Sequence, residues 1–212
     1  MSVLDDISAA VQAGKKNDVE TLVRQAIDDG VSAKDILNGG LLAAMDIIGP
    51  KFRNNEIFVP EVLVAARAMN AGTALLKPLL MEAGAEPLGK AVIGTVKGDM
   101  HDIGKNLVRM MIEGKGIEIE DLGVDVAPEV FVNYVQTHPD VQLVCLSALL
   151  TTTLPSLQET VQALKDAGLS SQVKILVGGA PVTQEFADQI GADGYTADAG
   201  SAAAKAAEML AA

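Results

Sequence analysis

The chain is poor in cysteine and in aromatic residues, and each scarcity excludes a class of structure. Its 212 residues include one cysteine, no tryptophan and only 3% aromatic residues, against 49% hydrophobic residues in all. A single cysteine permits neither an intramolecular disulfide nor a thiolate metal cluster. Because Cys145 lies in the apolar run 143–146, we interpret it as a small buried hydrophobic residue. The core must therefore be aliphatic.

Basic residues are also scarce. Lysine and arginine together number 16 against 28 aspartate and glutamate residues, which gives a formal net charge of −12. Nonspecific binding to nucleic acid needs a basic surface that neutralises phosphates, so we expect no nucleic-acid partner. An acidic surface mainly favours solubility, and it can also steer encounters with basic partner proteins.

Long apolar stretches are missing as well. No apolar run reaches the roughly 18–20 residues that a membrane-spanning helix needs. The first six residues lack the basic segment with which a signal peptide begins. We therefore expect a cytoplasmic location and no association with a membrane.

The hydrophobic pattern changes near residue 87 and indicates two domains. Before it, apolar residues recur at helical spacing over 3–13, 18–27, 32–37, 41–48 and 59–83. Asp18 and Ser32 are the predicted helix caps, Gly39 and Gly40 mark a break, and Pro78 marks a kink or an end. This pattern predicts an N-terminal all-α helical bundle over residues 1–86.

After a linker at residues 84–89, the pattern alternates between strand and helix. Predicted strands cover residues 91–96, 117–121, 143–147, 174–177 and 194–195, and predicted helices cover 106–113, 128–136, 155–167, 183–190 and 202–210. Residues 89–212 are therefore predicted to form a flavodoxin-like (Rossmann-type) α/β domain with a five-stranded parallel sheet in the order 2-1-3-4-5.

A histidine directly follows the first predicted strand, in a loop with the spacing Asp-x-His-x-x-Gly. Open α/β sheets bind ligands at the carboxyl ends of their strands. Asp99 is close enough to accept the Nδ1–H of His101, which would leave Nε2 as a lone-pair donor, the usual form of a metal-ligating histidine. Gly104 suits a close approach by a ligand or a sharp turn. The alternative is a solvated histidine, and Asp102 could be a helix cap or a further polar contact.

Two other predicted strand ends carry small residues. Ser147 ends the third strand and is followed by a run of hydroxylated residues up to Ser156. Helix capping explains Thr153, but it does not explain Ser147. Gly178 and Gly179 follow the fourth strand, where a tight turn is the simplest explanation. The first, third and fourth strands would be neighbours in the predicted sheet, so these three loops would gather at one edge.

The Asp-x-His-x-x-Gly string resembles the signature of cobalamin-binding domains of the methionine synthase type, and its wider context resembles the small corrinoid proteins of methyltransferase systems. The resemblance covers the whole chain. It implies cobalamin, a cobalt corrinoid, bound base-off/His-on, with His101 in place of the nucleotide base as lower axial metal ligand. It also implies that Thr153 takes the place of the hydroxyl that bonds Asp99, which is a serine in methionine synthases.

The resemblance also places residues around the cofactor: Asp99, Met100, His101, Asp102, Ile103 and Gly104 in the first loop, Ser147, Leu149, Thr151 and Thr153 in the second, and Gly178, Gly179 and Ala180 in the third. Residues 52–62 resemble the cap module that covers the upper corrin face and shields the cobalt-bound methyl group. Phe52, Val59 and Val62 occupy the capping positions. They could also be bundle core, Val62 above all.

The resemblance implies a carrier that takes a methyl group onto cobalt from a donor-specific methyltransferase and gives it to a second methyltransferase, which serves tetrahydrofolate or a thiol. A reductive activase is a further expected partner. Since no separate substrate pocket is visible, the chain would be a non-catalytic subunit of a methyltransferase system. The alternatives are a cobalamin-binding sensor, the cobalamin subunit of a mutase, or a flavodoxin-like interaction module without cofactor.

Overall fold

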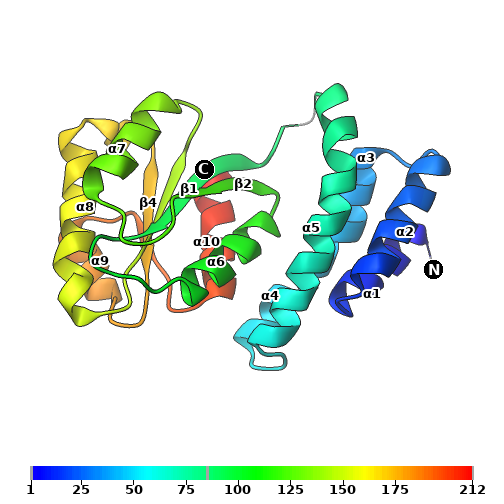
Figure 1. The fold of residues 1–212 in the computed structure, drawn as a ribbon, viewed down its shortest axis with the longest axis horizontal. Coiled ribbons are helices and arrows are strands. Elements are labelled where there is room, and N and C mark those ends of the chain that lie inside the picture. Colours follow the sequence, from blue (N-terminus) through cyan, green and yellow to red (C-terminus); the bar gives the residue numbers. More distant parts are fainter. Residues whose placement is uncertain (1, 85, 212) are drawn as a thin grey trace. The chain divides into compact units, whose positions relative to one another are not determined.

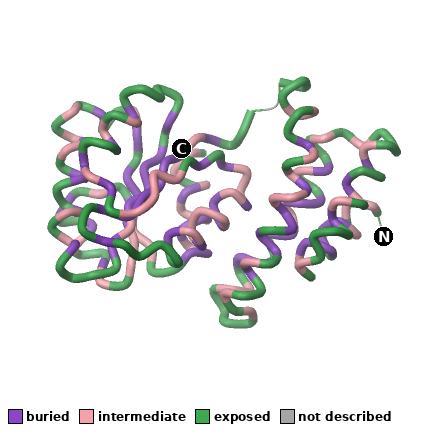
Figure 2. Tube along the Cα trace, in the orientation of Figure 1, coloured by how far each residue is buried: buried purple, intermediate pink, exposed green. Residues whose placement is uncertain are grey.

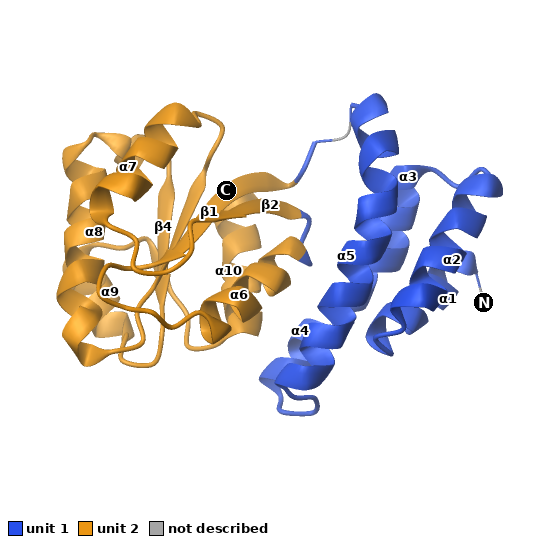
Figure 3. Cartoon of the chain, viewed as in Figure 1, with its two compact units in different colours: residues 1–87, 114–116 blue, residues 88–113, 117–212 orange. Residues whose placement is uncertain are grey.

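The computed structural model describes residues 2–84 and 86–211, so Ala85 of the predicted linker and the two terminal residues lie outside the described residues. The chain divides into two compact units (Figure 3). Unit 1 comprises residues 1–87 and 114–116, and unit 2 comprises residues 88–113 and 117–212. No helix of the described ranges is long and apolar enough to cross a membrane.

Unit 1 is built from helices, as predicted. They are α1 (Val3–Gln12), α2 (Lys16–Asp28), α3 (Ala33–Asp35), the π-helix η1 (Ile36–Leu42), α4 (Ala43–Arg53) and α5 (Val59–Glu82). Helix α2 packs along α5, and α1 packs against α2 and η1. The amphipathic helices turn their apolar faces toward one another, so that aliphatic side chains such as Ile7, Val19 and Leu41 are fully buried.

One predicted helix cap of unit 1 is confirmed and one is wrong. Ser32 caps α3 as predicted, because its hydroxyl accepts the main-chain N–H of Asp35 at 3.1 Å. Asp18 is not a cap: α2 begins two residues earlier, after Lys15, and Asp18 lies in its first turn, where a carboxylate favours the helix dipole. Helix α5 continues past Pro78 to Glu82, one residue short of the predicted end at residue 83.

The predicted break at Gly39 and Gly40 is wrong. The π-helix η1 runs through both glycines into α4. A Cβ on Gly39 would lie 3.0 Å from Leu4 Cδ1, and one on Gly40 would lie 2.9 Å from Ile7 Cγ2. The glycines therefore allow η1 to approach α1 closely, and this packing outweighs their weak intrinsic preference for a helix.

Unit 2 has the predicted doubly wound fold (Figure 1). Its strands are β1 (Gly89–Thr95), β2 (Ile117–Asp121), β3 (Leu143–Ser147), β4 (Lys174–Gly178) and β5 (Gly194–Tyr195). All neighbouring strands pair in parallel in the order β2-β1-β3-β4-β5, which confirms the predicted topology. Helices α6 (Ile103–Glu113) and α10 (Ala199–Ala211) cover one face, and α7 (Pro128–Thr137), α8 (Leu154–Asp166) and α9 (Gln184–Ile190) cover the other.

Strands β1, β3 and β4 are mostly buried on both faces, as their β-branched and aliphatic runs require, whereas β2 alternates between buried and exposed residues (Figure 2). One core cluster joins residues of β1, β3 and β4 to α7, α8 and α9, with Phe131 as its largest fully buried side chain. Cys145 is buried within β3, and burial raises the pKa of its thiol to about 12. The thiol is therefore the inert core residue that the sequence predicted.

The strand register brings three loops together. Thr95 at the end of β1 pairs with Ser147 at the end of β3, and Ser147 pairs with Gly178 at the end of β4. Because parallel strands keep a common direction, the chain leaves these three neighbouring strands at the same edge. The loops that follow β1, β3 and β4 therefore lie side by side.

Replacing Gly94 should destabilise unit 2, because a Cβ there would lie 2.6 Å from Cζ of the fully buried Phe131. We expect Gly94→Ala to lower the free energy of unfolding by about 1–3 kcal/mol, measured by urea unfolding, and Phe131→Leu to restore part of the loss. Gly104→Ala is the control, since a Cβ there meets no described atom within 4 Å. Wild-type stability in Gly94→Ala would contradict the packing argument.

Candidate functional site

His101 lies between β1 and α6, at the edge where the three loops meet. Its side chain is half exposed, at 50%. Its Nδ1 lies 2.7 Å from Oδ1 of Asp99, and the same oxygen accepts the main-chain N–H of His101 at 3.1 Å. The buried hydroxyl of Thr95 donates to the His101 carbonyl oxygen at 2.8 Å. The imidazole is thus held through both its ring and its main chain.

Asp99 is fully buried and accepts hydrogen bonds on both oxygens. Its Oδ2 accepts the main-chain N–H of Leu149 at 2.7 Å and the hydroxyl of Thr153 at 2.8 Å. Burial by itself would raise the pKa of Asp99, but the hydrogen bonds from Leu149, His101 and Thr153 outweigh it and lower the pKa to about 2. The carboxylate is therefore ionised at neutral pH and can only accept. In the neutral imidazole the proton lies on Nδ1, which leaves the lone pair on Nε2.

Thr153 occupies the N-cap position of α8, but its side chain makes no cap hydrogen bond. Its hydroxyl lies 2.8 Å from Asp99 Oδ2 and 2.9 Å from the carbonyl oxygen of Leu150, and the residue is only 4% exposed. The capping explanation for Thr153 is therefore wrong. The hydroxyl instead bonds a carboxylate that lies 54 residues earlier in the sequence.

Large apolar side chains are exposed next to the imidazole. Met100 is 69% exposed and Ile103 76%, and Leu149 on the neighbouring loop is 39% exposed. Gly104 follows in the first turn of α6, where no described atom would touch an added Cβ. A flat ligand with a large apolar surface could therefore approach His101 from the solvent side and cover these side chains.

The remaining predicted residues lie at the ends of β3 and β4. Ser147 and Gly178 are partly buried, and Thr151 and Ala180 are exposed. Gly179 has a φ of +129°, and a Cβ there would lie 1.8 Å from the carbonyl oxygen of Ala148. The fold itself therefore requires glycine at position 179, whatever the ligand. Asp102 precedes α6, and its carboxylate accepts a hydrogen bond from the Asn106 side chain at 3.3 Å.

The predicted capping residues all lie in unit 1. Phe52 is in the last turn of α4 and Val59 begins α5, and both are partly buried. Val62 is fully buried. The more exposed aromatic side chain is Phe58, at 62%, which the sequence analysis did not select. The role of Phe52, Val59 and Val62 as a cap stays a prediction.

Sequence reasoning also missed Thr95. Threonine within an apolar run is a good strand former, so nothing in its immediate neighbours marks its hydroxyl as part of the site. Its position as the last residue of β1 is the one signal that could have identified it, because ligand-binding groups gather at that end.

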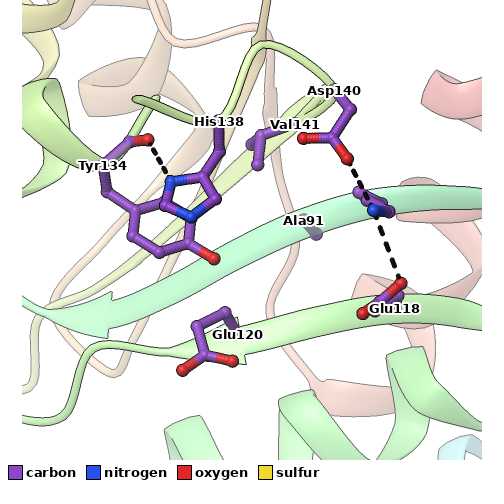
Figure 4. A pocket seen from close by; sticks show the side chains of 8 residues that line it. Ala91, Glu118, Glu120, Tyr134, His138, Asp140 and Val141 are labelled. Carbon is purple, nitrogen blue, oxygen red and sulfur yellow. Dashed lines mark hydrogen bonds and ion pairs between the residues drawn. The ribbon is translucent and has the colours of Figure 1, made fainter. Parts of the chain in front are cut away.

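A separate pocket of ≈ 110 Å³ lies at the amino end of β1, away from the edge that carries His101 (Figure 4). The rings of Tyr134 and His138 stack there with centroids 4.1 Å apart. Lys90 bonds Asp140 at 2.5 Å and lies 3.8 Å from Glu118, so the lysine pairs with two of the carboxylates that line the pocket. His138 is exposed, and its Nδ1 lies 2.8 Å from the carbonyl oxygen of Tyr134.

The lowered pKa of Asp99 predicts a pH-dependent contribution to stability. Because the folded-state pKa of about 2 lies below the ordinary value of 3.8, the contribution is present above about pH 4 and is lost as the pH falls toward 2. Asp99→Asn removes this titration. The difference in unfolding free energy between wild type and variant should be largest near pH 6 and should shrink below pH 4. A pH-independent difference in urea unfolding would contradict this, and the exposed Asp102→Asn serves as control.

Comparisons with known proteins identify the family of the chain. The family model described as a B12 binding domain matches residues 89–207, and a second model with the same description matches residues 3–77. The dimethylamine corrinoid protein 1 of Methanosarcina acetivorans is 41% identical over 210 residues, which cover 99% of this chain and 98% of that protein.

Two solved structures share the fold over nearly the whole chain. A cobalamin-binding protein from Desulfitobacterium hafniense is 31% identical with a TM-score of 0.80, and the match covers 97% of this chain and 98% of that one. A chain of the methanol:cobalamin methyltransferase complex MtaBC from Methanosarcina barkeri is 29% identical with a TM-score of 0.86, over 99% of this chain and 80% of that one. The chain therefore belongs to the cobalamin-binding corrinoid proteins of methyltransferase systems, as the resemblance of its sequence predicted.

Proposed function

We propose that this protein carries a methyl group on cobalamin between two methyltransferases, with His101 as the lower axial ligand of cobalt in a base-off/His-on arrangement. The observation that carries the proposal is the contact between Asp99 and Nδ1 of His101 at 2.7 Å. That contact fixes the ring and leaves Nε2 as the donor nitrogen. His101 offers one nitrogen, so a metal bound there takes its other ligands from elsewhere, as cobalt in a corrin ring does.

The residues present fit such a cofactor. Cobalamin, when bound, supplies a cobalt ion that can accept a methyl group and release it. Met100, Ile103 and Leu149 offer exposed apolar surface for a corrin ring. Gly104 adds no side chain that would keep the ring away from Nε2. The remaining loop residues, at the ends of β3 and β4, would line the slot for the nucleotide tail: Ser147, Thr151, Gly178, Gly179 and Ala180.

The polar relay controls where a proton can reside. Asp99, with a pKa of about 2, stays ionised at neutral pH. A proton that enters the pair when Nε2 is not bound to metal therefore goes to Nε2, and there it blocks ligation. Thr153 and the Leu149 N–H keep Asp99 in place throughout, since both bond Oδ2 and neither bonds the imidazole.

A methyl carrier needs partner enzymes that load and unload the methyl group. One methyltransferase specific for the methyl donor would load the cofactor, and a second, serving tetrahydrofolate or a thiol, would unload it, with a reductive activase for oxidised cobalt. The relatives named for dimethylamine and methanol systems support a small molecule as the methyl donor. Residues 1–86 would act as the cap domain and residues 89–212 as the cofactor domain, and a cytoplasmic location stays a prediction.

A sensor or mutase subunit is less well supported, because the similarity to corrinoid proteins spans both units.

The axial-ligand proposal is tested by electron paramagnetic resonance of the reconstituted cobalt(II) protein. A nitrogen below cobalt splits each line into a triplet, so the wild type should show triplets and His101→Ala should lose them. Cobalamin binding should weaken by about tenfold or more but persist, because the loops after β3 and β4 are unchanged. His138→Ala, at the only other histidine, is the matched control and should keep the triplets. A wild type without triplets, or triplets retained in His101→Ala, would refute the ligand assignment.

The cap proposal is tested by photolysis of the methylcobalamin-loaded full chain. If Phe52 and Val59 shield the methyl group, Phe52→Ala and Val59→Ala should each raise the photolysis rate. Phe58→Ala is the comparison, since this exposed aromatic lies beside the predicted cap. An increase confined to Phe58→Ala would transfer the capping role to Phe58 and contradict the prediction from the sequence.

A further inference from the structure

The loop between β2 and α7 belongs to none of the three cofactor loops, yet it bonds the loop that carries His101. The carboxylate of Asp125 accepts the main-chain N–H of Gly98 at 2.7 Å. The main-chain N–H of Asp125 donates to the carbonyl oxygen of Asp99 at 2.9 Å. Asp125 thus bonds main-chain groups of two successive residues, Gly98 and Asp99, in the loop that leads to His101.

Asp125 adopts an unusual conformation to do this. Its φ is +54°, in the left-handed region that non-glycine residues seldom enter. Aspartate and asparagine tolerate the region best, because their short polar side chains can hydrogen-bond locally. Here the side chain and the N–H of Asp125 are both engaged with the loop after β1. The conformation is therefore coupled to holding that loop.

The rest of the β2–α7 loop is itself anchored. The N–H of Thr95 donates to the Gly123 carbonyl at 3.0 Å, and the N–H of Val126 donates to the Thr95 carbonyl at 3.0 Å. Asp121 pairs with the buried ammonium of Lys105 at 2.5 Å and also accepts the Gly123 N–H at 2.9 Å. Asp125 therefore projects from a fixed support, so that its bonds can set the position of Asp99.

We propose that Asp125 is a positioning residue for the axial ligand: it fixes the main chain of Asp99 and thereby the angle at which His101 presents Nε2. Asp99 is then held from two sides, by Leu149 and Thr153 at its side chain and by Asp125 at its main chain. The proposal rests on the proposed ligation by His101. Asp125 itself would not touch the cofactor.

Three substitutions separate the hydrogen bond from the conformation. Asp125→Gly keeps the left-handed conformation accessible and removes the acceptor for Gly98. Asp125→Asn keeps both the conformation and an acceptor oxygen, so it should behave as wild type. Asp125→Ala also removes the acceptor, but alanine adopts the left-handed conformation less readily than glycine does. It serves as a second variant if Asp125→Gly does not fold. Asn55→Gly is the matched control, because Asn55 is the other non-glycine residue at positive φ in the described chain, at +59°.

The first measurement uses the full-length protein without cofactor. Nuclear magnetic resonance reports the exchange rate of the Gly98 amide and the tautomer of His101. In Asp125→Gly we expect at least tenfold faster exchange at Gly98, since the acceptor of its hydrogen bond is lost, and a smaller share of the Nδ1–H tautomer. Asp125→Asn and Asn55→Gly should match wild type in both respects.

The second measurement uses the cobalt(II) protein. The fraction of spectra with nitrogen triplets should fall in Asp125→Gly, and the pH at which the triplets disappear should shift, while Asp125→Asn restores wild-type behaviour. Unchanged exchange, tautomer and triplets in Asp125→Gly would overturn the proposal, and so would an equal loss in Asp125→Asn. A wild type without triplets would refute ligation by His101 instead, and the cofactor-free data would still decide whether Asp125 positions the ring.

Discussion

The buried, ionised carboxylate of Asp99 is the feature on which the site depends. A charge removed from water is costly unless hydrogen bonds replace its hydration. Asp99 receives them from His101 on its own loop and from Leu149 and Thr153 on the loop after β3. Because the donors belong to two different strand ends, the carboxylate is satisfied only when β1 and β3 are in register. The orientation of the imidazole is therefore a consequence of the sheet pairing.

Thr153 shows how the site competes with local stability. A threonine at an N-cap position would normally bond the main chain of its own helix and stabilise it by about 1 kcal/mol. In α8 this bond is absent, because the hydroxyl is oriented toward Asp99. Functional sites are where such departures from local rules are expected. The departure itself marks Thr153 as part of the site, independently of any resemblance to known families.

The sequence predicted the fold well because the fold depends on local patterns. Strands and helices alternate along unit 2, with apolar runs at β1, β3 and β4, and right-handed crossovers leave few arrangements for five such units. The pair of Asp99 and His101 could be predicted because only one residue separates them. Asp125 could not, because it lies on another loop and no spacing rule connects residues 99 and 125. Thr95 was marked only by its position at the end of β1. Gly39 and Gly40 were misread for a similar reason: their partners, Leu4 and Ile7, lie on another helix.

The contacts that orient His101 all come from the protein itself. Both oxygens of Asp99, the Nδ1 and carbonyl oxygen of His101 and the carboxylate of Asp125 have partners in the fold. The orientation of the imidazole is therefore fixed by folding. A ligand that binds Nε2 would not have to order the ring, so binding would lose less conformational entropy. The same logic explains why the supporting residues are spread over the ends of β1, β2 and β3. A loop that is bonded only to itself can tilt as a unit, whereas one that is bonded to its neighbours on both sides can move only if the sheet edge moves with it.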